Sequence, residues 1–172
     1  MSSFNPRQRS ASLSGQIAIA LYRVSQAMGY LFRARGTAQQ LSPAQIQALL
    51  FLRYARPGVR TIGGLAGRLA STYATTSGVV DALESKELVE RQHSPEDQRT
   101  VTLHLTDKGQ DKTNVLEDVL SDIEAVIGEL PADEQEALVR AMQAVVHRLQ
   151  AHGHVQVYEM CWGCQFFQHN IH

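Results

Sequence analysis

The stretch from Thr72 to Lys86 reads TYATTSGVVDALESK, and the rest of the chain is interpreted outward from it. Val79, Val80 and Leu83 recur at helical spacing, which predicts a helix with these three side chains facing inward. The first turns of this helix are rich in hydroxyl groups and are expected to be exposed. A shorter apolar segment, residues 62–70, precedes it and is predicted to form a second helix in tandem with it.

Residues 88–106 follow with the sequence LVERQHSPEDQRTVTLHLT, two β-type runs around a polar turn at residues 95–98. The second run alternates apolar and polar side chains, as a half-buried strand does. Helix, tight turn, helix and two-stranded ribbon is the order of a winged helix-turn-helix, whose second helix enters the DNA major groove. The sequence therefore predicts a mainly α protein with a small β-wing (α+β class) that binds DNA.

Long helices are predicted on both sides of this unit. Apolar residues recur at helical spacing from residue 13 to 35, and Gly36 is expected to end that helix. Ser42 and Pro43 are typical of an N-cap and a first helical position. A helix capped by Asp107 is predicted to run to about residue 129, and another from 132 to 150. The expected organisation is a flexible N-terminus at 1–12, one domain at 13–150 with its winged helix at about 42–106, and a tail at 151–172.

Composition limits the protein class. The 172-residue chain is 44% hydrophobic and contains only two cysteines, so an ordinary globular domain without a disulfide framework is expected. No apolar run approaches the roughly 18 residues of a membrane span, and no signal peptide is evident, so a cytoplasmic location is expected. Residues 1–80 contain nine arginines and no acidic residue, whereas residues 81–172 hold all 17 acidic residues. This asymmetry favours a polyanion as partner, although solvated helix faces would also account for it.

Amphipathic helices at both ends of the domain need a surface to cover their apolar stripes. A homodimer whose first and last helices interlock would do so, and it would place two reading helices on neighbouring turns of the major groove. The predicted partners are therefore a second copy of the chain and palindromic double-stranded DNA.

Residues 41–109 resemble the MarR family of bacterial winged-helix regulators. The likeness rests on LSPAQIQALLFL, on TIGGLAGRLA and above all on VVDALESKELVERQHSPEDQRTVTLHLTDKG. The flanking helices extend it to about residues 13–150. The resemblance implies a dimeric transcriptional regulator, here expected to be a repressor. A small molecule, metal or oxidant often sets the affinity of such regulators for a palindromic operator.

The resemblance also implies which residues contact DNA. Asp97 and Arg99 match the family's wing-tip pair, in which the acid orients an arginine that enters the minor groove. A narrow minor groove concentrates negative potential and attracts a guanidinium, so this assignment is chemically reasonable. The remaining candidates lie at the start of the matched recognition helix and between the two wing-tip residues. They are Thr72, Tyr73, Thr75, Thr76 and Ser77 in the helix and Gln98 in the wing.

The chain departs from the family pattern at the same surface. Gly78 and Ala82 stand where many relatives have basic residues, and Tyr73 replaces a common lysine. Gln98 occupies the position of a usual second wing arginine, and Glu87 that of a usual helix-ending glycine. Arginine-to-guanine contacts are therefore not available from these helix positions, and an unusual operator preference is expected.

The tail carries a separate pattern, C-x-x-C-x4-H-x-x-H. Its two thiolates and two imidazoles form a donor set suited to tetrahedral zinc, which makes zinc a candidate cofactor. The candidate ligands are Cys161, Cys164, His169 and His172. Two other interpretations stay open: a dithiol–disulfide redox pair, and a tail whose aromatic side chains pack on the dimer.

A pocket between the winged helix and the long helices is the expected site for a small effector. Its candidate lining residues are the aromatic side chains Tyr22, Tyr30, Phe51 and Tyr54, each of which could instead pack in the core. Sequence signatures of nucleotide-binding loops, serine hydrolases and zinc proteases do not occur, so no enzymatic activity is expected. The alternative function is a metal or redox module that uses its winged helix for protein contacts.

Overall fold

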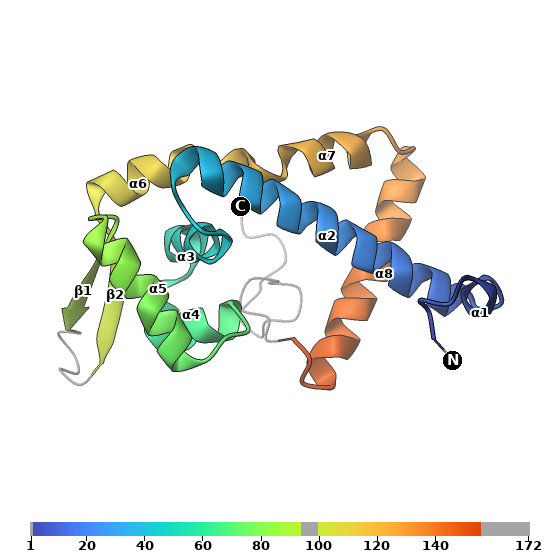
Figure 1. Ribbon diagram of the computed structural model, residues 1–172, viewed down its shortest axis with the longest axis horizontal. Helices are drawn as coiled ribbons and strands as arrows, with labels where there is room; N and C mark the ends of the chain where they lie inside the picture. Colours follow the sequence, from blue (N-terminus) through green and yellow to red (C-terminus); the bar gives the residue numbers. More distant parts are fainter. Residues whose placement is uncertain (1, 94–99, 156–172) are drawn as a thin grey trace, which may run out of the picture.

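A computed structural model describes residues 2–93 and 100–155 of the chain. Mostly α-helices with one two-stranded antiparallel sheet make up the fold, which confirms the predicted class (Figure 1). The elements are α1 (Pro6–Ser10), α2 (Leu13–Gln39), α3 (Pro43–Tyr54), η1 (Pro57–Val59), α4 (Ile62–Arg68), α5 (Tyr73–Ser85), β1 (Val89–His93), β2 (Val101–Leu105), α6 (Asp107–Asn114), η2 (Glu117–Leu120), α7 (Ser121–Gly128) and α8 (Ala132–Ala151). None of these helices is long and apolar enough to cross a membrane.

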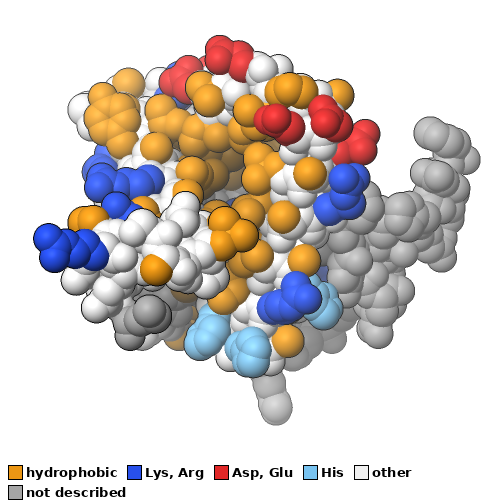
Figure 2. All heavy atoms as spheres, turned by 90° about the vertical axis from the view of Figure 1, so that its right-hand side faces the viewer, with side chains coloured by type: hydrophobic (Ala, Val, Ile, Leu, Met, Phe, Trp, Pro, Cys, Tyr) orange, Lys and Arg blue, Asp and Glu red, His pale blue; other side chains and the backbone are white. Residues whose placement is uncertain are grey.

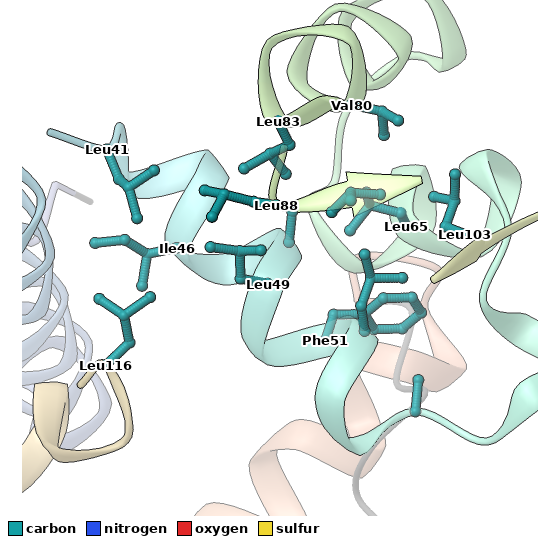
Figure 3. Packing of buried hydrophobic residues seen from close by; sticks show 14 of the residues in the cluster. Leu41, Ile46, Leu49, Phe51, Leu65, Val80, Leu83, Leu88, Leu103 and Leu116 are labelled. Carbon is teal, nitrogen blue, oxygen red and sulfur yellow. The ribbon is translucent and has the colours of Figure 1, made fainter. Parts of the chain in front are cut away.

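The hydrophobic core lies around α3, whose apolar side chains pack with residues of α4, α5 and the β-ribbon and with Leu116, which precedes η2. Figure 3 shows Leu49 and Phe51 of α3 among side chains from these other elements. Leu65, Leu83 and Leu103 are fully buried there. The winged helix is therefore held together by one shared core, which fixes the position of α5.

Local capping explains where the central helices begin. Ser42 forms a capping box with Gln45 at the start of α3, and the Thr61 hydroxyl accepts from the Gly64 backbone N–H at 3.1 Å. Thr72 caps α5 in the same way through Thr75. Between α4 and α5, Ala70 adopts a left-handed conformation with φ of 48°. These caps confirm the predicted starts of all three helices.

The β-ribbon is attached to the rest of the winged helix through β2. The strands pair with Arg91 opposite Leu103, and the Leu103 N–H donates to the Arg60 carbonyl at 2.7 Å. Leu103 is fully buried, and Val89 of β1 is also buried. The root of the ribbon is thus fixed in the core while its two strands extend away from it (Figure 1).

The first long helix does not end at Gly36 as predicted. α2 continues to Gln39, and Gln40 ends it in the left-handed conformation with φ of 57°. The glycine is needed for close packing, because a Cβ at Gly36 would lie 2.3 Å from the Leu41 carbonyl oxygen. Glycine here lets the chain fold back tightly toward α3, and it does not break the helix.

The predicted helix from 107 to 129 is also interrupted. Thr106, rather than Asp107, caps α6, and the chain then passes through the 3-10 turn η2 before α7. Leu116 and Val119 are buried at this break. Arg35 of α2 forms an ion pair with Asp118 at 2.6 Å, so the break lies where the chain is bonded to α2.

The N-terminal segment predicted to be flexible contains a helix. Asn5 caps α1 by accepting from the Arg7 N–H, and the Phe4 ring packs edge-on against Tyr22 at 5.6 Å between centroids. By contrast, the predicted helix after Leu130 and Pro131 is confirmed as α8. No residue of α8 is buried within the described chain.

Glu87 ends the α5 region in a left-handed conformation, with φ of 59° at a position where the family pattern has glycine. Lys108 donates a hydrogen bond to its carboxylate at 2.9 Å. This bond and the positive charge hold the pKa of Glu87 below its ordinary value of 4.5.

Lys108→Met is expected to raise the pKa of Glu87 toward 4.5, as measured by NMR titration of the side-chain carboxyl. A depressed folded-state pKa stabilises the fold above the unfolded-state pKa, and that contribution is lost as pH falls through the folded-state value. Lys112→Met serves as a charge-matched control, since Lys112 bonds to Gln39 instead. An equal Glu87 pKa in the wild type and Lys108→Met would contradict the assignment.

Candidate nucleic-acid interface

The first turn of α5 presents polar groups to solvent, as the sequence predicted. Thr72, Tyr73 and Thr75 are exposed, and the Tyr73 side chain is 63% exposed. The hydroxyls of Thr72 and Thr75 lie 2.9 Å apart, so they form a paired donor and acceptor at the helix start. Hydroxyls of this kind can bond to base edges or to phosphates.

Thr76 was predicted to be part of this exposed group, and that prediction is wrong. Its side chain is 0% exposed, and its hydroxyl has no hydrogen-bond partner among the described residues. Thr76 precedes Val80 by four residues and Leu83 by seven, so it lies on the buried stripe of α5. That spacing was the signal that could have identified it as a core residue.

Thr76→Val is expected to stabilise the fold by about 1 kcal/mol, because it replaces an unsatisfied buried hydroxyl with a methyl group of the same shape. Thermal or denaturant unfolding measures the change. Thr75→Val is the matched control, since Thr75 is exposed and bonded to Thr72, and it should bring no gain. A loss of stability in Thr76→Val would mean that the hydroxyl is satisfied in solution.

Ser77 is half-buried and faces the wing. Arg91 of β1 donates to its hydroxyl at 3.4 Å and to the Asp81 carboxylate at 2.7 Å. The same guanidinium bonds to Glu84 through its other terminal nitrogen. Sequence reasoning missed this contact, because it joins residues that are distant in the chain and carries no local periodicity.

The exposed side of α5 carries no basic residue, which agrees with the departures seen in the sequence. Gly78 is exposed, and a Cβ built on it would meet nothing within 4 Å. Lys86, which follows the helix, donates to the Gln40 carbonyl at 2.6 Å and to Gln45 at 3.2 Å. That ammonium is thus held against the α2–α3 junction.

Several predicted site residues lie outside the described residues. They are the wing-tip candidates Asp97, Gln98 and Arg99 and the proposed zinc ligands Cys161, Cys164, His169 and His172. Within residues 2–93 and 100–155, no group of three or more His, Cys, Asp or Glu side chains is placed to hold a metal ion.

The four aromatic residues proposed to line an effector pocket differ in their surroundings. Phe51 is 1% exposed and belongs to the hydrophobic core, which is the alternative that the sequence had left open for it. Tyr22, Tyr30 and Tyr54 are exposed in the chain described here. The Tyr54 hydroxyl bonds to Glu117, which also pairs with Arg53 at 2.7 Å.

An apolar face covers the side of the molecule opposite the wing. Figure 2 shows hydrophobic side chains gathered on a hollowed surface at this side, where Figure 1 places α1, the start of α2 and α8. Exposed large hydrophobic residues of α2, α7 and α8 include Leu13, Ile17, Val24, Met28, Val126, Ile127, Leu138, Val139 and Leu149. Exposed apolar area of this extent is characteristic of an interaction surface.

Comparison with known proteins places the winged helix in a family. Residues 41–101 match the model of the MarR family. The HTH-type transcriptional repressor YetL of Bacillus subtilis is 26% identical over 135 residues, which span 78% of this chain and 81% of that protein. Two further transcriptional regulators of that organism, both uncharacterised, are 36% and 30% identical over 70 residues, so the matches span only 47% and 42% of their lengths.

Solved structures extend the likeness beyond the winged helix. The transcriptional repressor CouR, bound to a 23-mer DNA duplex, is 28% identical, with a TM-score of 0.63 over 81% of this chain and 95% of that chain. BpsR of Bordetella bronchiseptica, whose DNA binding is regulated by 6-hydroxynicotinic acid, is 25% identical, with a TM-score of 0.61 over 78% and 96%. Together with the fold and the exposed start of α5, these findings show that residues 41–101 form a MarR family domain, within a fold shared with winged helix-turn-helix transcriptional regulators of the MarR type.

Proposed function

We propose that this protein is a repressor that binds a palindromic operator as a homodimer, with α5 as its recognition helix. The observation that carries the proposal is the exposed polar start of α5, which projects from a rigid core. Thr72, Tyr73 and Thr75 are the base- or phosphate-contacting residues, and Ser77 lies at the edge of this group. The DNA-bound state of the similar CouR structure supports the same use of the fold.

The apolar face formed by α2, α7 and α8 is the proposed contact with the second subunit. No residue of α8 is buried within its own described chain, so a helix of 20 residues has little to pack against in a monomer. Sedimentation equilibrium at micromolar concentration is expected to give twice the mass of one chain. A monomeric mass under these conditions would refute the dimer.

Selection of bound sequences from random duplex DNA tests the proposed function directly. The expected result is a palindrome whose half-sites are about 10 base pairs apart, because a twofold dimer places two recognition helices one helical turn apart. Binding should weaken steeply as salt is added, since phosphate contacts release counterions. Failure to enrich any sequence, with weak salt-independent binding, would instead favour a winged helix that contacts proteins.

Arg99 is proposed to enter the minor groove from the wing tip, with Asp97 orienting it and Gln98 beside it. Arg99→Ala is expected to weaken operator binding roughly tenfold and to lower the salt slope by about one, since one cation is lost from the interface. A fluorescence titration at several salt concentrations measures both. Lys112→Ala is the control, because it removes an equal charge from α6, outside both the proposed DNA contact and the proposed subunit contact. Unchanged affinity and slope in Arg99→Ala would remove Arg99 from the interface.

We further propose that an effector sets the operator affinity, either a small ligand or the zinc or redox state of Cys161, Cys164, His169 and His172. Regulation of BpsR by 6-hydroxynicotinic acid supports the first possibility for a similar fold. Metal analysis of untagged protein, with thiol titration, tests the second. One zinc per subunit and release of the operator by a chelator would support a metal effector, whereas freely titratable thiols without zinc would refute it.

A further inference from the structure

Arg91 joins the wing to the recognition helix. Its guanidinium donates to Asp81 at 2.7 Å, to Glu84 and to Ser77 at 3.4 Å, so strand β1 is tied to three residues of α5. We infer that Arg91 is a positioning residue that fixes where the wing lies relative to the recognition helix. The inference rests on the proposed DNA-binding function, in which α5 and the wing must meet the DNA together.

The direction of the Arg91 side chain follows from the strand. Side chains two residues apart lie on the same face of a strand, so Arg91 shares a face with the buried Val89. That face is turned toward α5, because the Arg91 side chain contacts Ser77, Asp81 and Glu84 of that helix. Arg91 also pairs across the ribbon with Leu103, which is fixed in the core. Its backbone is therefore anchored, and its side chain reaches α5 from a defined point.

The acceptors on α5 are arranged to hold a guanidinium in one orientation. Asp81 and Glu84 are three residues apart and lie on one helix face. They accept from different terminal nitrogens of Arg91, so the planar guanidinium is fixed by two separate carboxylates. Lysine, with a single nitrogen at the end of a flexible side chain, could not make the same paired contact.

Charge alone gives no reason for this cluster to lie beside DNA. One arginine and two carboxylates carry a net negative charge, which repels phosphates. α5 contains no basic residue to compensate. The two acids therefore cost binding energy unless they serve the geometry of the site, and their contacts with Arg91 supply such a role.

The double variant Asp81→Asn with Glu84→Gln separates geometry from charge. It removes two negative charges and leaves Arg91 uncompensated, so a purely electrostatic role predicts tighter operator binding. A positioning role predicts weaker binding, roughly tenfold, the loss expected when a groove contact is misplaced. Titration with the operator selected by the wild type decides between them, and tighter or unchanged binding would overturn the inference.

Arg91→Lys provides a second, charge-conserving variant. Arg91→Lys is expected to weaken operator binding about as much as the double variant does. Wild-type operator affinity in Arg91→Lys would show that the guanidinium does not position the wing. Glu90→Gln, on the opposite face of the same strand, is the matched control and should change the wing little. Thermal unfolding checks that every variant is folded, and Asp81→Asn alone replaces the double variant if that one unfolds.

Hydrogen exchange of the β1 and β2 amides in DNA-free protein gives a readout that does not depend on the proposed function. Faster exchange in the double variant and in Arg91→Lys, with wild-type exchange in Glu90→Gln, is the expected result. If the wild type selects no operator, the proposed function fails, and exchange alone then decides the role of Arg91. Unchanged exchange in both test variants would overturn it.

Discussion

Phe51→Ala is expected to lower the free energy of unfolding by about 3–5 kcal/mol, which is the range for truncating a fully buried aromatic residue. Its ring is 1% exposed and lies among core residues contributed by α3 and its neighbouring elements (Figure 3). The loss combines the transfer energy of the ring with the cavity that it leaves. α5 and the ribbon share this core. The variant should therefore bind less DNA, because a larger fraction of it is unfolded.

Chemical denaturation with detection of helical signal measures the effect of Phe51→Ala. Phe51→Leu is the matched control, because it keeps most of the apolar volume and should cost much less. Tyr54→Phe, three residues later, removes only an exposed hydroxyl bonded to Glu117 and should have a small effect. A stable Phe51→Ala protein with an altered response to small aromatic ligands would instead restore Phe51 to an effector pocket.

Features encoded by neighbouring residues were predictable from the sequence. Ser42 was recognisable as a helix start because a cap needs only a hydroxyl and the next few backbone N–H groups, and Thr61 and Thr72 cap the next two helices in the same local way. The alternation of residues 101–105 gave the wing strand for a similar reason. The cap depends on contacts within a few residues, and the alternation is visible within five consecutive residues, so both could be read without the tertiary structure.

Features set by packing were predicted less well. Gly36 was predicted to end a helix. Its absent side chain instead makes room for the Leu41 carbonyl, which lies beyond the helix end and packs against it. Thr76 was predicted to carry an exposed hydroxyl, but its side chain is buried in the core together with the apolar stripe of α5. In each case the residue type suggested one role, and its neighbours in space imposed another.

Long-range polar contacts could not be predicted at all. The helix breaks between α6 and α7, where Arg35 forms an ion pair with Asp118 and Arg53 forms one with Glu117. The apolar spacing in the sequence continues across this break, so one continuous helix was predicted. Arg91 likewise meets Asp81 only because the ribbon folds back on α5. A partly buried ion pair between distant residues leaves no periodic signal, so the contacts that hold the wing on α5 were visible only in the structure.

Gly64→Ala is expected to destabilise the fold by about 1–3 kcal/mol, the usual cost of forcing an added methyl into a packed site. A Cβ at this position would lie 2.1 Å from the Val59 carbonyl oxygen, which is a backbone atom and cannot rotate away. That carbonyl accepts from the Thr61 N–H at 2.8 Å, and Thr61 in turn caps α4. Moving it would disturb the start of the helix on which α5 packs.

Gly63→Ala is the matched control, one residue away in the same helix, and it should act with the opposite sign. The nearest atom to its added Cβ would be the Thr61 hydroxyl at 3.9 Å, which is ordinary contact. Alanine also costs less backbone entropy than glycine in a helix, so a gain of about 0.5 kcal/mol is expected. Urea denaturation of both variants compares them directly. Equal destabilisation by the two would mean that helix α4 is intolerant of any side chain there, whereas opposite signs would locate the constraint at the Val59 carbonyl alone.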